Sequence, residues 1–337
     1  MRYRLLGRSG LRVSEFGLGT MTFGGDWGWG ADADESRRIF EAYAGAGGNL
    51  VDTANNYTNG SAERLVGEFI AADRDHFVLA SKYTLSERAD DPNFGGNHRK
   101  NLLRSVRASL QRLNTDHLDV LYVHAWDGTV GVDELMRALD DLVRAGQVLH
   151  LGVSDTPAWV VARANTVAEL RGWTPFTVLQ APYSLAQRDV ERDLIPMAHA
   201  LNLPLVAWGV LAGGIMTGKY NRPTTEPSRH DPGRVSEARK SVAEAVLAVA
   251  EEVGRPAPQV AINWVRQQPH PVIPLMGSRS ASQFRDNLGC LEFTLSAEHM
   301  ARLSAASPID LGFPHSFLAG KQVQELIHGA TADRLMR

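Results

Sequence analysis

The amino-acid sequence predicts a (β/α)8 barrel that forms one domain over residues 1–337. Three observations predict this fold. Short apolar runs alternate with helical patterns until eight strands are reached, and the composition shows no break between them. Polar, ionisable residues stand at the ends of successive apolar runs, and the carboxyl ends of barrel strands meet on one face. Chains of this length often fold as a single barrel domain.

The first half of the chain supplies four strands, each followed by a helix. The strands are expected at 16–20, 49–54, 77–82 and 117–124, and the helices at 34–46, 61–72, 98–113 and 133–146. The three later strands are rich in Val, Leu or Phe, which favours buried strands. Ser61 is expected to open the second helix and Gly146 to close the fourth, because a hydroxyl and a glycine suit those ends.

The second half supplies the other four strands, with one interruption. The strands are expected at 148–154, 176–181, 204–209 and 271–277, and the helices after Thr156-Pro157 and at 187–201, 236–253 and 258–268. The stretch 215–235 is too long for a plain connection and contains Pro223, Pro227 and Pro232, which predicts a mobile flap. Residues 308–337 form a C-terminal tail, whose segment 312–315 is expected to lie over the pocket or to cover the barrel.

The composition excludes several partners. A formal net charge of -3, from 35 basic and 38 acidic side chains, gives no electrostatic footprint for nucleic acid or an anionic membrane. The first residues lack the apolar stretch of a secretory signal, and no run approaches the length of a transmembrane helix. Cys290 is the only cysteine, so no internal disulfide can form, which is typical of a reducing compartment. We therefore expect a cytoplasmic enzyme.

Four residues at or just beyond strand ends have the chemistry of a hydride-transfer site: Asp52, Tyr57, Lys82 and His124. Reduction of a carbonyl needs an acid for the developing alkoxide, and a lysine ammonium beside a tyrosine lowers the pKa of the phenol. Lys82 is expected to act in this way on Tyr57 while Asp52 holds it by a charge-assisted hydrogen bond. His124 is expected to donate to the substrate oxygen. A metal-dependent hydrolase is disfavoured, because His124 is the only histidine that qualifies as a strand-end ligand.

Each of these residues also has an ordinary structural interpretation. Tyr57 would then be loop surface and Lys82 a solvated side chain. Asp52 would cap a strand end, and His124 would be a core histidine with satisfied hydrogen bonds. The joint arrangement on neighbouring strand ends, rather than any single residue, favours the catalytic interpretation.

The sequence resembles the aldo-keto reductase family over roughly residues 1–310. Six segments, in the family's order, are similar to its blocks: 7–25, 51–70, 118–124, 152–155, 211–220 and 277–288. Asp52, Tyr57, Lys82 and His124 match the family's catalytic tetrad position by position. The resemblance implies a (β/α)8 barrel that reduces aldehydes or ketones to alcohols, with a hydride from NADPH and a proton from Tyr57. It is nearest to the longer-chain prokaryotic branch, which is related to potassium-channel β subunits.

The end of the eighth strand carries groups that suit an anion. Gly277, Ser278 and Arg279 precede a helix expected from Ala281, and they offer backbone N–H groups, a hydroxyl and a guanidinium. The resemblance assigns the 2′-phosphate of NADPH to this segment. It assigns the adenine to the helix face that carries Gln283, Asp286 and Asn287. A capped helix with a polar surface is the alternative.

Residues near other strand ends match positions that hold the rest of the dinucleotide. Ser154 and Gln180 match hydrogen-bonding groups for the nicotinamide, and Trp208 matches an aromatic plate against its ring, as in the channel β-subunit branch. The resemblance also implies contacts from Thr20, Met21, Asp52, Gly209, Val210, Leu211, Ala212, Lys219 and Arg229, of which Lys219 and Arg229 match pyrophosphate contacts. Asp155 stands where the family usually has asparagine. Because a carboxylate cannot donate to the carboxamide oxygen, its contact with the nicotinamide stays open.

A redox-sensing subunit that binds the cofactor and turns over slowly is the alternative function. His124 favours an enzyme, because the channel β subunits often have asparagine at that position. Trp27, Trp29 and Trp126 follow the first and fourth strands and favour an aromatic or apolar carbonyl substrate, although packing at the rim explains them equally well. The sequence predicts no metal, and it leaves the physiological substrate, the reaction direction and the oligomeric state open.

Overall fold

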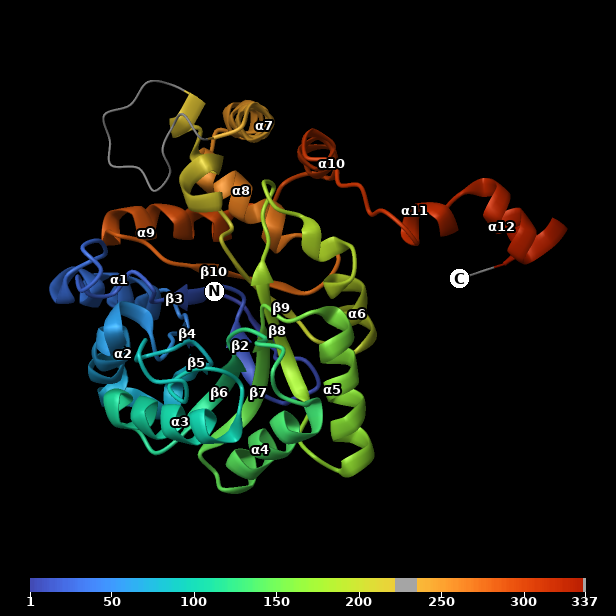
Figure 1. Cartoon of the computed structure of the whole chain (residues 1–337). Coiled ribbons are helices and arrows are strands. Elements are labelled where there is room, and N and C mark those ends of the chain that lie inside the picture. Colours follow the sequence, from blue (N-terminus) through green and yellow to red (C-terminus); the bar gives the residue numbers. More distant parts are fainter. Residues whose placement is uncertain (222–234, 336–337) are drawn as a thin grey trace.

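The computed structural model describes residues 1–221 and 235–335, in which eight parallel strands close into a barrel surrounded by helices (Figure 1). The strands are β3 (Gly17–Gly19), β4 (Leu50–Asp52), β5 (Val78–Tyr83), β6 (Leu118–Val123), β7 (Val148–Ser154), β8 (Phe176–Pro182), β9 (Leu205–Trp208) and β10 (Val272–Met276). They follow one another around the barrel in chain order, and β10 closes it by pairing with β3. The predicted (β/α)8 barrel is confirmed, and all eight expected strands are present.

Helices follow the strands and cover the outside of the barrel (Figure 1). They are α1 (Ala33–Gly45), α2 (Ser61–Ile70), α3 (Arg99–Leu113), α4 (Val132–Arg144), α5 (Ala158–Arg171), α6 (Leu194–Ala200), α7 (Glu237–Val253), α8 (Ala257–Arg266), α9 (Ala281–Leu288) and α10 (Ala297–Ala306). Gly146 follows α4 with a φ of 71°, as expected of its closing residue. Gly60, not Ser61, is the N-cap of α2, and Ser61 is its first helical residue. None of the helices in the described ranges is long and apolar enough to cross a bilayer.

The helix expected at 187–201 is shorter than its pattern indicates. A 3-10 turn covers Asp189–Glu191, and α6 begins only at Leu194. Pro196 explains the late start, because proline lacks an N–H and is tolerated in the first helical turn, where that N–H would have no partner within the helix. The prediction that this helix begins at residue 187 was therefore wrong.

An antiparallel hairpin, which the sequence patterns did not indicate, closes the amino end of the barrel. Its strands are β1 (Tyr3–Leu5) and β2 (Arg12–Ser14). Leu6 and Val13 are buried in one cluster with inward-facing residues of six barrel strands, which include Val78. With this end filled, the carboxyl ends of the strands form the face on which a site can be built.

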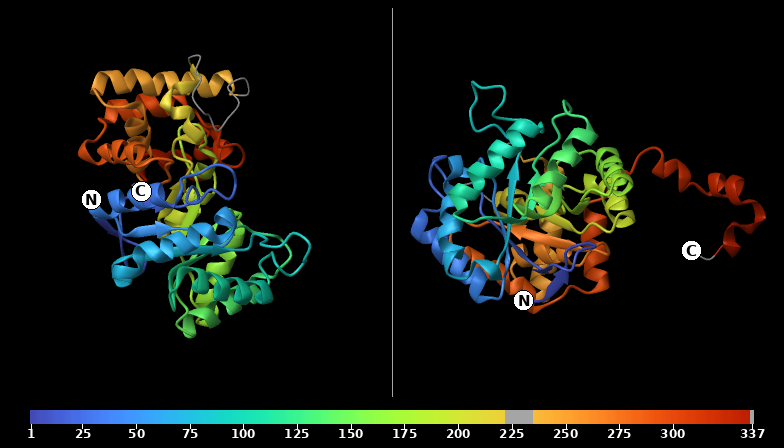
Figure 2. Two further views of the ribbon diagram at one scale, coloured as in Figure 1. Left: turned by 90° about the vertical axis from the view of Figure 1, so that its left-hand side faces the viewer. Right: turned by 90° about the horizontal axis from the view of Figure 1, so that it is seen from below.

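The segment 312–315 contacts the outside of the barrel, since His315 Nε2 lies 3.3 Å from Asp193 Oδ1 beside α6, and the rest of the C-terminal tail leaves the barrel. Its helices, α11 (His315–Leu318) and α12 (Lys321–His328), extend away from the barrel in Figure 1 and in the right-hand view of Figure 2. The Arg192 guanidinium donates to the Asp310 carbonyl at 2.9 Å and holds the start of the tail. The part of the expected flap that is described, residues 215–221, lies in two 3-10 turns. Residues 222–234, with the three prolines and Arg229, lie outside the described residues.

Candidate active site

Three hydrogen bonds from one buried ammonium organise the carboxyl end of the barrel. Lys82, near the end of β5, donates from Nζ to Asp52 Oδ1, to the Thr53 carbonyl at 2.9 Å and to the Tyr57 hydroxyl at 3.2 Å. Lys82 and Asp52 are almost completely buried. All three protons of the ammonium therefore have acceptors, which fixes its position beside the phenol.

Asp52 ends β4 and has a second partner that the sequence did not reveal. Gln180, in β8, donates from Nε2 to Asp52 Oδ2 at 2.8 Å, so each carboxylate oxygen accepts a hydrogen bond. Thr20 donates to the Asp52 carbonyl from its hydroxyl at 2.9 Å and from its backbone N–H at 3.0 Å. Asp52 is therefore held from three sides, since Lys82 of β5 and Gln180 of β8 bond to its carboxylate and Thr20, after β3, bonds to its backbone carbonyl.

Tyr57 reaches this group from a strained turn that follows β4. Thr58 and Asn59 have φ values of 44° and 52°, and Gly60 follows with 87°, so the chain turns sharply behind the tyrosine. The Thr58 hydroxyl donates to the Phe23 carbonyl at 2.7 Å and accepts from the Ala62 N–H at 3.0 Å. These bonds tie the turn to the loop after β3 and to the first turn of α2.

The pKa values of Tyr57 and Lys82 differ from the expectation in one respect. Burial raises the pKa of Tyr57, and the opposing effect of the Lys82 ammonium does not reverse it. The expected net lowering of the tyrosine pKa was wrong, because burial penalises the phenolate more strongly than one ammonium stabilises it. Burial also opposes the charge on Lys82, but Asp52 and Tyr57 together outweigh it and the lysine pKa is raised. The phenol is thus a proton donor beside a fixed cation.

His124 follows β6 and faces the tyrosine ring. The two ring centres are 5.9 Å apart, with the planes at 79°. Burial, followed by the charge of Lys82, lowers the pKa of His124 to about 3. Its Nδ1 is buried and has no hydrogen-bond partner among the described residues. The imidazole is therefore neutral at neutral pH and can donate one hydrogen bond.

An aromatic wall continues from Tyr57 into the loop after β3. The centres of the Trp27 and Tyr57 rings are 6.5 Å apart, and those of Trp27 and Trp29 are 5.7 Å apart. Both tryptophans are partly exposed, Trp29 by 38%. Trp126, after β6, packs partly on the core and donates its backbone N–H to the Asp155 carbonyl at 3.3 Å. Of the three expected tryptophans, Trp27 is therefore the one whose ring contacts the tetrad.

The positions expected to hold the nicotinamide come from adjacent strands. Ser154 of β7 and Gln180 of β8 are register partners, and Trp208 ends the neighbouring β9. Trp208 is 39% exposed, so a large aromatic face lies open at the barrel mouth. Asp155 follows Ser154 in a left-handed conformation with a φ of 40°, and the residue is exposed. These donors and this open ring fit a planar polar heterocycle.

The segment after β10 leads into α9, the helix expected from Ala281, and it has one unexpected neighbour. Ser280 caps α9 by accepting from the Gln283 N–H at 3.3 Å. The Glu35 carboxylate, from α1, accepts from the Ala281 N–H at 2.6 Å, so this helix terminus already receives an anionic oxygen. Arg279 is exposed beside it. No sequence pattern indicates this role for Glu35, because its partner is 246 residues away.

The remaining cofactor positions are placed as follows. Thr22 ties the loop after β3 to the segment after β10, since its hydroxyl donates to the Ser278 carbonyl at 2.7 Å, and Gly277 is exposed beside them. Within the barrel mouth and along α9, Val210 and Asn287 are buried, Met21, Leu211, Ala212 and Lys219 are partly buried, and Gly209, Gln283 and Asp286 are exposed. Arg229 lies outside the described residues.

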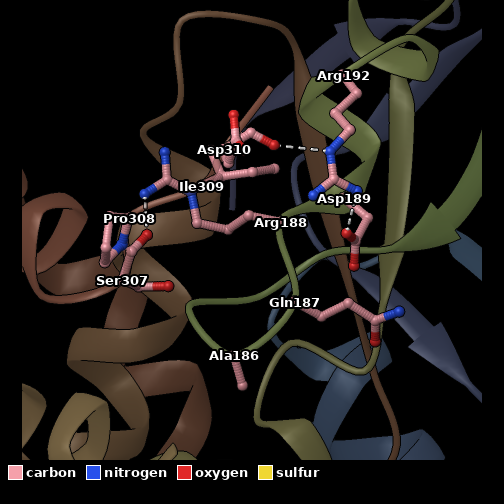
Figure 3. A pocket seen from close by; sticks show the side chains of 9 residues that line it. All are labelled: Ala186, Gln187, Arg188, Asp189, Arg192, Ser307, Pro308, Ile309 and Asp310. Carbon is pink, nitrogen blue, oxygen red and sulfur yellow. Dashed lines mark hydrogen bonds and ion pairs between the residues drawn. The ribbon is translucent and has the colours of Figure 1, made fainter. Parts of the chain in front are cut away.

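A pocket between the loop after β8 and the start of the tail contains none of the tetrad (Figure 3). Arg188 and Arg192 point into it, but both guanidinium groups are engaged. Arg188 donates to the Ser307 carbonyl at 2.5 Å and to Glu191, and Arg192 donates to Asp189. The two arginines of this pocket therefore hold residues 307–310 against the barrel.

The sequence profile described as "Aldo/keto reductase family" matches residues 15–308. The chain belongs to the aldo/keto reductase family. As a member of that family it is an oxidoreductase of the carbonyl-reducing class. The matched range contains all four tetrad residues and every described cofactor position, from Thr20 to Asn287.

Curated relatives of this aldo/keto reductase cover nearly all of the chain. Norsolorinic acid reductase A of Aspergillus parasiticus is 41% identical over 329 residues, which are 94% of this chain and 84% of the relative. The aryl-alcohol dehydrogenase [NADP(+)] of Phanerodontia chrysosporium is 36% identical over 347 residues, and the match covers 95% of this chain and 89% of the relative. A putative aryl-alcohol dehydrogenase of Saccharomyces cerevisiae is 36% identical over 338 residues, and the match covers 94% of this chain and 89% of the relative.

Proposed function

We propose that this aldo/keto reductase reduces aldehydes and ketones, aromatic ones among them, to alcohols with NADPH as the hydride donor and Tyr57 as the proton donor. The observation that carries the proposal is the Lys82 ammonium, which donates to Tyr57 and is itself held by Asp52. Bound NADPH would supply the hydride. The single buried Cys290, which can form no internal disulfide, supports a cytoplasmic setting.

The residues of the site have separable roles in the proposed reaction. Tyr57 gives its hydroxyl proton to the oxygen on which negative charge develops, and Lys82 stabilises the phenolate that remains. Asp52 keeps Lys82 charged and in place. His124, which is neutral, orients the substrate oxygen through a hydrogen bond from its ring. Because burial keeps the phenol protonated, the proton moves only as the alkoxide forms.

The cofactor would lie from the barrel mouth to α9. Ser154, Gln180 and Trp208 suit the nicotinamide end, with two hydrogen-bonding groups and one open aromatic face. Ser278 and Arg279, beside the amino terminus of α9, suit a phosphate. The Phanerodontia relative carries NADP(+) in its name, which supports the same cofactor for this chain.

Trp27 and Trp29 are the reason for proposing aromatic substrates. Trp27 and Trp29 extend the surface of Tyr57 away from the tetrad, and such a wall favours a planar aromatic molecule. Two relatives named above act, by their names, on norsolorinic acid and on aryl alcohols. We therefore place an aryl aldehyde or ketone beside Trp27.

The test is consumption of NADPH by the full chain with benzaldehyde, an aryl ketone, a quinone and a short aliphatic aldehyde. The proposal expects turnover, with higher kcat/KM for the aryl compounds. A protein that binds NADPH but barely oxidises it with every compound would instead be a redox-sensing subunit. Absence of NADPH binding would overturn both functions.

A further inference from the structure

A fully buried asparagine, Asn97, joins the loops that follow β5 and β6. From Nδ2 it donates to Thr84 Oγ1 and to the Ala125 carbonyl, both at 3.0 Å. Its Oδ1 accepts from the Asp127 N–H at 2.8 Å, and its own N–H donates to Asp127 Oδ2 at 2.7 Å. Because the Asp127 N–H can only donate and the Ala125 carbonyl can only accept, the orientation of the amide is fixed.

The Asn97 amide continues the hydrogen-bond ladder between β5 and β6 beyond the ends of the two strands. Tyr83 ends β5, and its carbonyl accepts from the His124 N–H at 3.2 Å. The next residue, Thr84, leaves the extended conformation with a φ of 105°, so the strand ends there. The amide then connects Thr84 with Ala125, the residue after His124. One side chain therefore takes the place of the next backbone pair.

The close approach of the two loops depends on the glycine that precedes Asn97. Gly96 has a φ of 85°, and a Cβ there would lie only 2.8 Å from Asp127 Oδ2. The Gly96 N–H donates to the Thr84 carbonyl at 2.8 Å. The Tyr83 hydroxyl donates to the Asn97 carbonyl at 3.3 Å. The backbone and the side chain of Asn97 are therefore both fixed.

The His124 ring depends on its backbone for its position. Its Nδ1 is buried and has no hydrogen-bond partner among the described residues, so no hydrogen bond from that nitrogen fixes the ring. The ring meets Tyr57 edge to face, with the centres 5.9 Å apart. The chain is held before the ring by the Tyr83 carbonyl and after it by Asn97. Loss of the Asn97 amide would free one of these two sides.

We propose that Asn97 is a positioning residue that acts through His124 and keeps the imidazole where it donates to the substrate oxygen. The inference rests on the proposed function, in which His124 orients that oxygen for the proton of Tyr57. A displacement of about 1 Å can cost on the order of 10² in rate, so Asn97→Ala should lower kcat about ten- to hundredfold. NADPH affinity should stay unchanged, because none of the contacts of Asn97 involves a candidate cofactor residue.

A purely structural role for Asn97 makes a different prediction. If the amide only stabilises the two loops, its loss should lower kcat by the same factor whether or not the imidazole is present. If it acts through His124, its loss should cost little once the imidazole has been removed. A double-mutant cycle of Asn97→Ala with His124→Ala separates the two roles, because it measures the coupling between the two side chains.

The experiment measures kcat and KM for an aryl aldehyde, and the NADPH dissociation constant, with the full chain. The proteins are the wild type, Asn97→Ala, Asn97→Asp, His124→Ala and the two double variants. Asn97→Asp guards against poor folding, because aspartate keeps the size of the side chain and the acceptor for the Asp127 N–H. An ionised aspartate has no N–H to donate to the Ala125 carbonyl.

Asn165→Ala is the matched control. This asparagine is also buried, and its amide bonds to the backbone of Phe176, as donor at 3.1 Å and as acceptor at 2.9 Å. Phe176 begins β8, so these bonds lie at the amino end of the barrel, away from the tetrad. Urea midpoints show how much stability each variant loses, and the control shows what such a loss alone does to kcat.

The expected result is a fall of kcat by about ten- to hundredfold in both Asn97 variants, and by less than about threefold when the same changes are made in His124→Ala. Asn165→Ala should lower the urea midpoint and leave kcat nearly unchanged. An unchanged kcat in the Asn97 variants, equal factors in the two backgrounds, or an equal fall in Asn165→Ala would overturn the proposal. Absence of NADPH oxidation by the wild type, or full kcat in His124→Ala, would instead overturn the proposed function or the role it gives His124, so the failures are distinguishable.

Discussion

Lys82 Nζ lies 3.2 Å from the Tyr57 hydroxyl, yet the pKa of that hydroxyl is above its ordinary value, because burial outweighs the ammonium charge. The phenol is therefore protonated throughout the neutral range. It becomes a useful acid only when negative charge develops on a substrate oxygen, and the phenolate then receives the Lys82 hydrogen bond. The Lys82 ammonium therefore stabilises the phenolate that forms in the transition state, and it does not ionise Tyr57 in the resting enzyme.

Tyr57→Phe should remove the proton donor and leave cofactor affinity nearly unchanged. Loss of a general acid typically costs ~10²–10⁴ in rate. The measurement is kcat for an aryl aldehyde together with the NADPH dissociation constant. Tyr3→Phe is a matched control, because the Tyr3 hydroxyl bonds only to the Gly47 carbonyl among the described residues, away from the tetrad. Near-normal turnover in Tyr57→Phe would reject Tyr57 as the acid.

Arg279→Ala should weaken NADPH binding and leave NADH binding almost unchanged. A charge-assisted bond to a phosphate contributes about 1.5–3 kcal/mol, so the expected loss for NADPH is roughly tenfold or more. Fluorescence titration of both cofactors checks this. Arg285→Ala, an exposed arginine on the same helix, is the control. If NADPH and NADH lose affinity to the same extent, Arg279 supports the loop instead of reading the 2′-phosphate.

Glu35→Gln should strengthen NADPH binding relative to NADH. The Glu35 carboxylate accepts from the Ala281 N–H at 2.6 Å, at the helix terminus where the 2′-phosphate is expected, and two anions there repel. Glutamine keeps an oxygen acceptor without the charge. The gain should be about two- to fivefold at low salt and should shrink as salt is added. A loss of affinity at every salt concentration would place the phosphate elsewhere.

Acidification should lower the free energy of unfolding, because of His124. Its folded-state pKa is about 3, mainly through burial, whereas the unfolded value is near 6.5. Between these values the unfolded chain binds a proton that the native protein does not, so stability falls as pH falls through that window. Urea midpoints at pH 7 and pH 5 measure this.

The same histidine should contribute no ionisation near pH 6.5 to kcat/KM, because the imidazole stays neutral there in the folded enzyme. In His124→Asn the drop of the urea midpoint between pH 7 and pH 5 should be smaller than in the wild type. An equal drop in both proteins would mean that the histidine titrates normally in the folded state.

The tetrad was predictable because its members stand at strand ends that any parallel barrel brings together. Apolar runs locate those ends within one or two residues, as β5 and β6 illustrate. Local chemistry also explains what was missed near α6, since Pro196 is visible in the sequence and marks the helix start.

Other features depend on the folded geometry and leave no local trace. The hydrogen bond from Gln180 to Asp52 joins residues 128 positions apart, and the contact of Glu35 with α9 spans more still. The direction of the Tyr57 pKa is a balance between burial and one charge, and only the folded environment sets the burial. Patterns predict which residues meet, whereas the balance of their energies needs the structure.

Trp27→Ala should change substrate choice more than catalysis. The indole lies against Tyr57, with ring centres 6.5 Å apart, and we place the aryl group of the substrate beside it. Loss of an aromatic contact costs roughly 0.5–1.5 kcal/mol beyond the area it buries, so KM for benzaldehyde should rise about three- to tenfold or more. KM for a short aliphatic aldehyde, which cannot span the wall, should change little, as should kcat for both. If both substrates lose kcat equally, Trp27 orients Tyr57 and does not bind the aryl group.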